Sequence, residues 1–202
     1  MPFIFIRHAE SVANTGGISK SDKDVCLSEK GFTDAQMDLN NTGRPLDLIV
    51  VSPYLRTKQT AEYTIKTYPQ AFVAEWPVHE FSYLKCDGET TRDSRKQQRE
   101  DYWNRNDPDY RDDTSYPGTE SFNAFLDRVD KTIAILVKLP PQNVMVFTHG
   151  MFMRALYLRV VEKSRDMQLY KSLGHYVNLL TITTDGYLHW DFPKFSYPPE
   201  FL

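Results

Sequence analysis

The chain has 202 residues, of which 41% are hydrophobic and 25% are charged, and its formal net charge is −3. This composition fits one globular domain with a core of its own, and no long polar tract suggests disorder. Its basic residues are scattered among acids, which argues against a protein that binds nucleic acid through an overall positive field. An anionic substrate would therefore need a local group of cations.

The first apolar run, Phe3–Ile6, is interrupted by Arg7. It is too short to span a membrane and lacks the basic flank of a signal peptide. The two cysteines, Cys26 and Cys86, do not have metal-ligand spacing and are typical of thiols in a reducing compartment, although a disulfide between them stays open. We therefore expect a cytoplasmic protein without a membrane partner.

Short β-branched and aromatic runs alternate along the chain with longer segments of helical period. The strands that we expect are Phe3–Ile6, Asp47–Val51, Trp76–Val78, Asn143–Phe147, Asn178–Thr183 and Tyr187–Trp190. The helices that we expect are Ser28–Asn40, Pro53–Tyr68, Thr119–Leu139 and Met151–Val161. One face of the third helix should be apolar, and it contains Phe122, Phe125, Leu126, Val129, Ile133, Leu136 and Val137.

Several of the expected strands are continuous apolar runs, which is typical of a sheet that helices cover on both faces. Alternating strands and helices predict an α/β fold with right-handed crossovers. We therefore expect one domain over residues 1–202, with three layers (α/β/α) and a mostly parallel central sheet.

Four expected strands end close to residues whose side chains can bind ligands or take part in catalysis. His8 follows the first strand, Ser52 and Arg56 follow the second, Glu80 follows the third and His149 follows the fourth. Ligands of open parallel sheets bind beyond the carboxyl ends of the strands, so these residues should share one rim. Each also has a structural interpretation, as a solvated charge, an ion-pair partner or a core histidine. Their coincidence at one rim favours a functional site.

Arg7 and His8 are adjacent at the end of the first expected strand. An arginine presents a planar fork of donors that fits phosphate oxygens, whereas a neutral imidazole can attack phosphorus. The neighbouring cation should lower the pKa of His8, which keeps a nucleophilic nitrogen free near neutral pH. The pair suits a phosphate-binding nucleophile, but alone it is weak evidence.

Longer motifs accompany this pair in a fixed order. The first group is Arg7-His8-Ala9 with Glu10, Ser11 and Asn14. The second is Leu27-Ser28-Glu29-Lys30-Gly31, and the third is Ser52-Pro53-Tyr54-Leu55-Arg56-Thr57-Lys58-Gln59-Thr60-Ala61. The last group contains Glu80, Gly118-Thr119-Glu120-Ser121, Arg128 and Thr148-His149-Gly150.

These motifs resemble the histidine phosphatase superfamily, also called the phosphoglycerate mutase-like family. The first is similar to the family's Arg-His-Gly signature, with Ala9 at the glycine position, and the second to its Leu-Thr-x-x-Gly helix start. The third fits the family's Ser-x-x-x-Arg-x-x-Gln-Thr-Ala pattern at every named position. The resemblance covers the sheet and most helices, but not residues 85–117 or the C-terminal tail, and it implies a phosphoglycerate mutase-like fold.

The resemblance also implies roles for individual residues. His8 would attack phosphorus and become transiently phosphorylated, and the phosphate would be bound by Arg7, Asn14, Arg56, His149 and Gly150. We expect Glu80 to protonate the leaving alkoxide and later to activate water, with Glu120 as the second candidate. The resulting hypothesis is a phosphomonoester hydrolase that acts on a small phosphorylated substrate without a cofactor.

Other functions stay open at this level. A mutase would return the phosphoryl group to a second alcohol, but Phe81-Ser82-Tyr83-Leu84 departs from the continuation expected of phosphoglycerate mutases. A phosphate-binding interaction module without turnover is a third option. A metal-dependent hydrolase is disfavoured, because the chain lacks His-x-His and His-Glu-x-x-His motifs and its arginines would repel a divalent cation. The oligomeric state is also open, and a homodimer is one option.

Residues 85–117 form a long polar connection between the third expected strand and the expected helix Thr119–Leu139. Such a connection in a compact domain is usually a lid or a specificity insertion, and a part near Asp93–Trp103 should be helical. A solvated helix without a ligand role is an equal alternative. The candidates for substrate contacts are Arg92, Arg95, Tyr102, Trp103 and Glu120.

Overall fold

The structure is a computed structural model that describes residues 2–17, 21–36, 44–85, 91–105, 114, 118–140, 143–173, 179–183 and 188–189. The strands are β1 (Pro2–Arg7), β2 (Leu48–Val51), β3 (Phe72–Glu75), β4 (Val144–Thr148), β5 (Leu179–Thr183) and β6 (Leu188–His189). The helices are α1 (Glu29–Ala35), α2 (Leu55–Thr67), α3 (Arg92–Trp103), α4 (Phe122–Leu136), α5 (Gly150–Val160) and α6 (Met167–Ser172).

The strands form one sheet in the order β3-β2-β4-β1-β5-β6. The pairs β3–β2, β2–β4 and β4–β1 are parallel, whereas β5 runs antiparallel to β1 and β6 antiparallel to β5. The predicted mostly parallel sheet is therefore confirmed. Because β1 and β4 are central and parallel, the residues that follow them emerge at the same edge of the sheet.

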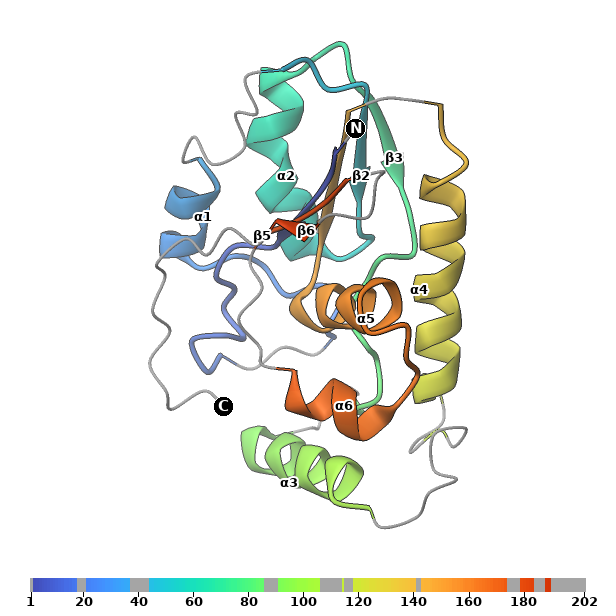
Figure 1. Cartoon of the computed structure of the whole chain (residues 1–202). Helices are drawn as coiled ribbons and strands as arrows, with labels where there is room; N and C mark the ends of the chain where they lie inside the picture. The colour runs from blue at the N-terminus through green and yellow to red at the C-terminus, as the bar shows by residue number, and fades with distance from the viewer. Residues whose placement is uncertain are drawn as a thin grey trace.

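Helices cover both faces of this sheet (Figure 1). In β4, Val144 and Val146 belong to the larger core cluster with residues of α4 and α5, whereas Met145 and Phe147 pack in a second cluster with Ala61 of α2. Successive side chains of a strand point to opposite faces, so a strand buried on both sides reads as one apolar run. The predicted three-layer α/β/α architecture is confirmed.

The third strand was predicted at the wrong place. Trp76–Val78 was expected, but β3 comprises Phe72–Glu75 at the edge of the sheet, where the Phe72 side chain is 71% exposed. The Trp76 amide still donates to the carbonyl of Val51. Pro77 follows and has no N–H for a further ladder bond, so the chain leaves the sheet there.

The apolar face of α4 was also predicted with one error. Val137 was expected in the core, but the helix ends at Leu136 and the side chain of Val137 is 67% exposed. Thr132 is buried instead, and its hydroxyl donates a hydrogen bond to the Arg128 carbonyl. That bond satisfies the polar group, which lets a threonine occupy a position that the apolar pattern alone would leave out.

The start of α1 follows the predicted motif and fixes the segment after β1. The Ser28 hydroxyl accepts the Gly31 amide and donates to the Glu10 carboxylate at 2.7 Å. A Cβ on Gly31 would lie 1.9 Å from the Glu10 carbonyl oxygen, so only glycine fits there. The expected helix reached Asn40, but α1 ends at Ala35, and residues 37–40 lie outside the described part of the chain.

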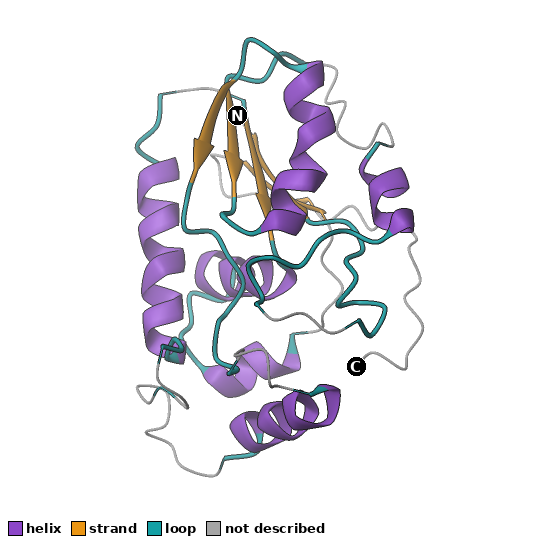
Figure 2. Ribbon diagram, turned by 180° about the vertical axis from the view of Figure 1, so that it is seen from behind, coloured by secondary structure: helices purple, strands orange, loops and turns teal. Residues whose placement is uncertain are grey.

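The expected helix near Asp93–Trp103 is confirmed as α3, whereas the short α6 was not predicted. α3 lies beside α6 at one end of the molecule in both overall views (Figures 1 and 2). Its Trp103 ring stacks on Tyr170 of α6 with a centroid distance of 5.9 Å, and Tyr102 is buried in the larger core cluster. None of the helices described is long and apolar enough to cross a bilayer.

Candidate active site

Two histidines meet at the carboxyl ends of the central strands. His8 follows β1 and His149 follows β4, and their ring centroids lie 5.1 Å apart. The His8 amide donates to the Thr148 carbonyl, which continues the β1–β4 pairing up to the site. Both side chains are buried, at 6% and 0% exposure. The parallel register of two neighbouring strands thus brings residues together that lie far apart in the sequence.

Arg56 joins the two imidazoles. It lies in the first turn of α2, and its Nε donates to His8 Nε2 at 3.1 Å while its Nη2 donates to His149 Nδ1 at 3.1 Å. Its Nη1 donates to the carbonyl of Asp22, and its guanidinium carbon lies 5.0 Å from the centroid of the Tyr54 ring. The guanidinium is therefore fixed on all sides rather than solvated.

The segment around Arg56 explains the long motif in physical terms. The Thr60 hydroxyl accepts the Ala9 amide at 3.0 Å and donates to the Arg56 carbonyl. The side-chain oxygen of Gln59 accepts the Leu27 amide at 2.8 Å. These bonds dock α2 onto the two loops beside it, so they hold the position of the arginine.

The hydrogen bonds of His8 define its tautomer. Its Nδ1 donates to the Ala9 carbonyl at 2.8 Å, so Nε2 is the unprotonated nitrogen, and its lone pair accepts from Arg56 Nε. Burial lowers the pKa of His8 well below its ordinary value, and the charges of Arg56 and Arg7 lower it further. The sequence prediction of a lowered pKa has the right direction, but burial is the larger cause.

His149 is oriented through its other nitrogen. Because Nδ1 accepts from Arg56, Nε2 carries the proton and donates to the Ser52 hydroxyl at 2.8 Å. Burial lowers the pKa of His149 well below its ordinary value, and Arg56 and His8 add to that effect. The free site therefore combines two neutral imidazoles with cationic arginines.

Arg7 and Gly150 lie against each other beside this pair. A Cβ on Gly150 would come within 3.3 Å of the Arg7 Nε, so the glycine lets the guanidinium lie close to the first turn of α5. Asn14 is engaged locally, because its side-chain oxygen accepts both the amide and the hydroxyl of Ser11. The expected phosphate ligands Arg7, Arg56, His149 and Gly150 are thus assembled at one place, and Asn14 lies in the turn that follows.

Glu80 reaches the same region from another part of the chain. Its Oε1 accepts the amide of Met151 at the N-terminus of α5. Burial raises the pKa of Glu80, although the charges of Arg56, Arg7 and Arg154 and the Met151 hydrogen bond oppose this shift. A carboxyl group with a raised pKa next to cations is suited to carry a proton that it can release.

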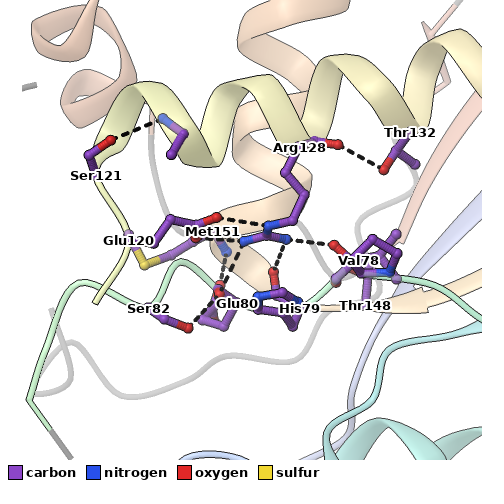
Figure 3. A network of polar contacts seen from close by, with 12 residues as sticks. Val78, His79, Glu80, Ser82, Glu120, Ser121, Arg128, Thr132, Thr148 and Met151 are labelled. Carbon is purple, nitrogen blue, oxygen red and sulfur yellow. Dashed lines mark hydrogen bonds and ion pairs between the residues drawn. The ribbon is translucent and has the colours of Figure 1, made fainter. Parts of the chain in front are cut away.

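Arg128 fixes the segment that carries Glu80 (Figure 3). Its guanidinium donates to the carbonyls of Pro77 and His79 at 2.7 and 2.9 Å, and more distantly to that of Glu80. Its Nε and Nη2 hold both oxygens of Glu120 at 2.9 and 2.7 Å. We call Arg128 and Glu120 the clamp. Glu120, the second candidate for the acid, therefore has both oxygens bound to an arginine.

The remaining candidates in residues 85–117 divide into three cases. Arg95 of α3 forms an ion pair with Asp22, whose carbonyl accepts from Arg56, so it lies near the site. Tyr102 is buried in the larger core cluster and Trp103 packs against it. The Trp103 indole donates to the Tyr83 hydroxyl. The side chain of Arg92 and most of the rest of the segment lie outside the described residues.

Several contacts could not be found from the sequence. Asp22 contributes to the site through its backbone carbonyl, which any residue type would supply. The Thr148 hydroxyl donates to the Val78 carbonyl at 2.5 Å, and that bond depends on where the chain leaves the sheet after β3. Among the residues that the structure describes, no group of three or more His, Cys, Asp and Glu side chains could hold a metal ion.

The family of the chain follows from comparison with known proteins. The model of the histidine phosphatase superfamily (branch 1) matches residues 3–188, so the chain belongs to this superfamily. The resemblance stated from the motifs is confirmed, and so is the assignment to the phosphatase class. A comparison with curated proteins gives no match.

Solved structures show the same phosphoglycerate mutase-like fold. The alpha-ribazole phosphatase from Shigella flexneri is 21% identical over 95% of each chain, with a TM-score of 0.71. A mycobacterial glucosyl-3-phosphoglycerate phosphatase is 23% identical over 95% of this chain and 93% of its own, with a TM-score of 0.67. A phosphoserine phosphatase mutant from Entamoeba histolytica is 18% identical over 94% of each chain, with a TM-score of 0.64.

Proposed function

We propose that this protein is a metal-independent phosphomonoester hydrolase that forms a phosphohistidine on His8, with Glu80 as the proton donor. The observation that carries the proposal is the bridge of Arg56 between the two imidazoles, at 3.1 Å on each side. A phosphate group that replaces this bridge would meet a nucleophilic nitrogen and fixed donors together. Phosphoryl transfer needs in-line positioning and charge compensation, and this arrangement supplies both.

In the first step, the lone pair of His8 Nε2 attacks phosphorus and the bond from phosphorus to the ester oxygen breaks. The lowered pKa of His8 keeps that nitrogen unprotonated at neutral pH. Arg7, Arg56 and His149 bind the non-bridging oxygens, whose negative charge is opposed by the guanidinium groups. A phosphomonoester dianion fits such a site better than a neutral ester.

The leaving alkoxide takes a proton from Glu80. The raised pKa of Glu80 keeps a fraction of the carboxyl protonated under conditions in which His8 is already neutral. In the second step, the Glu80 carboxylate removes a proton from water, and the resulting hydroxide attacks the phosphohistidine. Inorganic phosphate leaves, His8 regains its lone pair and Glu80 regains its proton.

The substrate class is a small phosphorylated alcohol. The structures with the same fold include phosphatases named for alpha-ribazole phosphate, glucosyl-3-phosphoglycerate and phosphoserine, whose alcohol halves differ widely. The donors that would bind the phosphate, Arg7, Arg56 and His149, are independent of the alcohol half. This supports the same phosphoryl-transfer reaction with different alcohols. Cytoplasmic residence is part of the same proposal.

A phosphoenzyme trap tests the proposal. Wild type and His8→Ala would be mixed with p-nitrophenyl phosphate in excess chelator, quenched rapidly and analysed by mass spectrometry. We expect a phosphorylated His8 peptide in wild type only, and a loss of kcat/KM by about 10⁴-fold or more in the variant. Activity that chelator removes and added metal restores would contradict metal independence.

The same assay with a bisphosphorylated primer or an acceptor alcohol added, together with a measurement of phosphate binding, separates the alternatives. A mutase would show turnover only after addition of a bisphosphorylated primer, and it would transfer the phosphoryl group to an added alcohol. A binding module without turnover would give no phosphohistidine, and His8→Ala would bind inorganic phosphate as well as wild type does. Release of phosphate to water without a primer supports the hydrolase.

A further inference from the structure

Arg154 is a buried arginine that has no role in the reaction proposed above. It lies on α5, its side chain is 4% exposed and its guanidinium carbon lies 4.9 Å from the centroid of the Tyr170 ring. Among the residues that the structure describes, neither its Nε nor its Nη2 has a hydrogen-bond partner. A buried guanidinium keeps its charge, so unmade hydrogen bonds on two of its nitrogens are unfavourable.

The two unpaired nitrogens define one edge of the guanidinium. Nε and Nη2 donate in parallel, and this edge matches two oxygens of a carboxylate or phosphate. Arg128 provides the comparison within the same molecule, because its Nε and Nη2 hold the two carboxylate oxygens of Glu120 (Figure 3). Arg154 presents the same edge, but no described acidic residue occupies it.

The position of Arg154 connects it with the acid side of the site. Side chains of a helix lean toward its N-terminus, and Arg154 follows Gly150 and Met151 by about one turn. The Met151 amide holds Glu80, and the Met151 carbonyl accepts the hydroxyl of Tyr170, the residue whose ring lies against Arg154. The guanidinium thus belongs to the surroundings of the carboxyl group that would protonate the leaving alcohol.

We propose that Arg154 binds an anionic group with two free oxygens on the leaving alcohol of the substrate. The preferred substrates are then phosphomonoesters whose alcohol half carries a carboxylate or a second phosphate. This inference rests on the proposed function, because it assigns the alcohol to the side of Glu80. Arg154 acts as a specificity residue, while Arg7, Arg56 and His149 bind the phosphoryl group that is transferred.

A matched substrate series tests this role. ω-Carboxyalkyl phosphates of increasing chain length would be compared with ω-hydroxyalkyl phosphates and alkanediol bisphosphates of the same length. We expect wild type to prefer an anionic substrate at one chain length by about ten- to hundredfold in kcat/KM. Comparison of the ω-carboxyalkyl phosphates with the bisphosphates shows whether the site prefers a carboxylate or a phosphate. No preference for either anion at any length overturns the proposal.

Three variants identify the residue responsible. Arg154→Met should reduce the preference to within about threefold, and Arg154→Lys should lose most of it, because lysine keeps the charge but lacks the two-donor edge. Arg159→Met is the control, since it removes an arginine from the same helix that pairs with Asp130 instead. An equal loss for anionic and neutral substrates in both Arg154 variants would overturn the proposal in favour of a structural role.

Two further readouts keep this test apart from that of the proposed function. p-Nitrophenyl phosphate lacks the second anion and its leaving group needs no proton, so in Arg154→Met the burst of p-nitrophenol that reports phosphorylation of His8 should stay within about threefold of the wild-type rate. If wild type hydrolyses no ester, the proposed function fails, and calorimetric binding of non-hydrolysable ω-carboxyalkyl phosphonates still tests Arg154. Equal affinities of wild type and Arg154→Lys for these phosphonates would then overturn the inference, and weaker binding by the variant would support it.

Discussion

The two histidines and Glu80 are held in different ways. His8 and His149 directly follow central strands, and the His8 amide is part of the β1–β4 hydrogen-bond pattern. Glu80 lies beyond the edge strand β3, and its segment is held by Arg128 of α4 and by the Thr148 hydroxyl. In the proposed mechanism His8 and His149 form the nucleophile side and Glu80 forms the acid side, so the sheet fixes the first and side chains fix the second. A substitution can disturb the second without moving the first.

The largest effect that separates the two sides should come from Glu80→Gln. On alkyl phosphates, whose alkoxides leave poorly, we expect kcat/KM to fall by about 10²- to 10⁴-fold. On p-nitrophenyl phosphate, whose leaving group needs no proton, phosphorylation of His8 should stay close to the wild-type rate. Stopped-flow release of p-nitrophenol and steady-state phosphate release measure the two steps.

The pH dependence of the same variant sharpens this comparison. Glu80 must be protonated to act as the acid, so the wild-type rate on alkyl phosphates should fall as the pH rises through the raised pKa of Glu80. In Glu80→Gln this alkaline limb should be absent. An unchanged limb together with an unchanged rate on alkyl phosphates would remove Glu80 from the mechanism.

A smaller effect should come from release of the clamp. Arg128→Met/Glu120→Gln removes both charges and the bonds to the carbonyls of Pro77 and His79, without leaving a buried charge unpaired. We expect kcat/KM on alkyl phosphates to fall by about tenfold, because Glu80 is less well positioned, while p-nitrophenyl phosphate is affected little.

Arg165→Met is the matched control for the clamp. Arg165 pairs with Asp127 and Asp130 of α4 and also donates to the Asn123 carbonyl, and none of these contacts involves the segment that carries Glu80. Urea unfolding of each variant reports its loss of stability separately from its loss of activity. A parallel loss on both kinds of substrate in the clamp variant would show that the two sides of the site are not independent.

The smallest effect concerns the stability of the nucleophile side. The pKa values of His8 and His149 are lowered in the folded protein, so the unfolded chain binds protons first as the pH falls below about 6.5. The stability contributed by the neutral imidazoles is present above that pH and is lost below it, by at most about 1.4 kcal/mol per histidine and pH unit.

Urea unfolding on both sides of about pH 6.5 measures this loss. His149→Gln should lose stability less steeply than wild type over the same interval, because one buried proton acceptor is missing. The same slope in both proteins would mean that His149 is not kept neutral by its surroundings.

The sequence predicts the nucleophile side better than the acid side for a physical reason. Central strands such as β4 are buried on both faces, so their apolar runs are easily recognised, and His8 and His149 follow them directly. The edge strand β3 exposes Phe72 and Val73, so its pattern does not indicate a strand. The path of the chain from β3 to Glu80 therefore could not be predicted, although Glu80 itself was selected as the acidic residue that follows the third expected strand.

Contacts that depend on tertiary packing could not be predicted from the sequence either. The carbonyl of Asp22 beside Arg56 and the hydroxyl of Thr148 beside Val78 belong to residue types without a distinctive pattern. In the sequence, Arg154 looks like one of two arginines on a mostly apolar helix. Its unpaired edge becomes visible only when its neighbours are known.

The central place of β1 has a consequence for how the protein is made. Phe3 pairs with Val144 on one side and with Ile182 on the other, so the strand that carries His8 pairs only with strands that follow it at long range in the chain. Such long-range pairing slows folding and leaves strand edges open to wrong partners on the ribosome. The nascent chain can therefore bring His8 and His149 together only after the long segment between β1 and β4 has been translated.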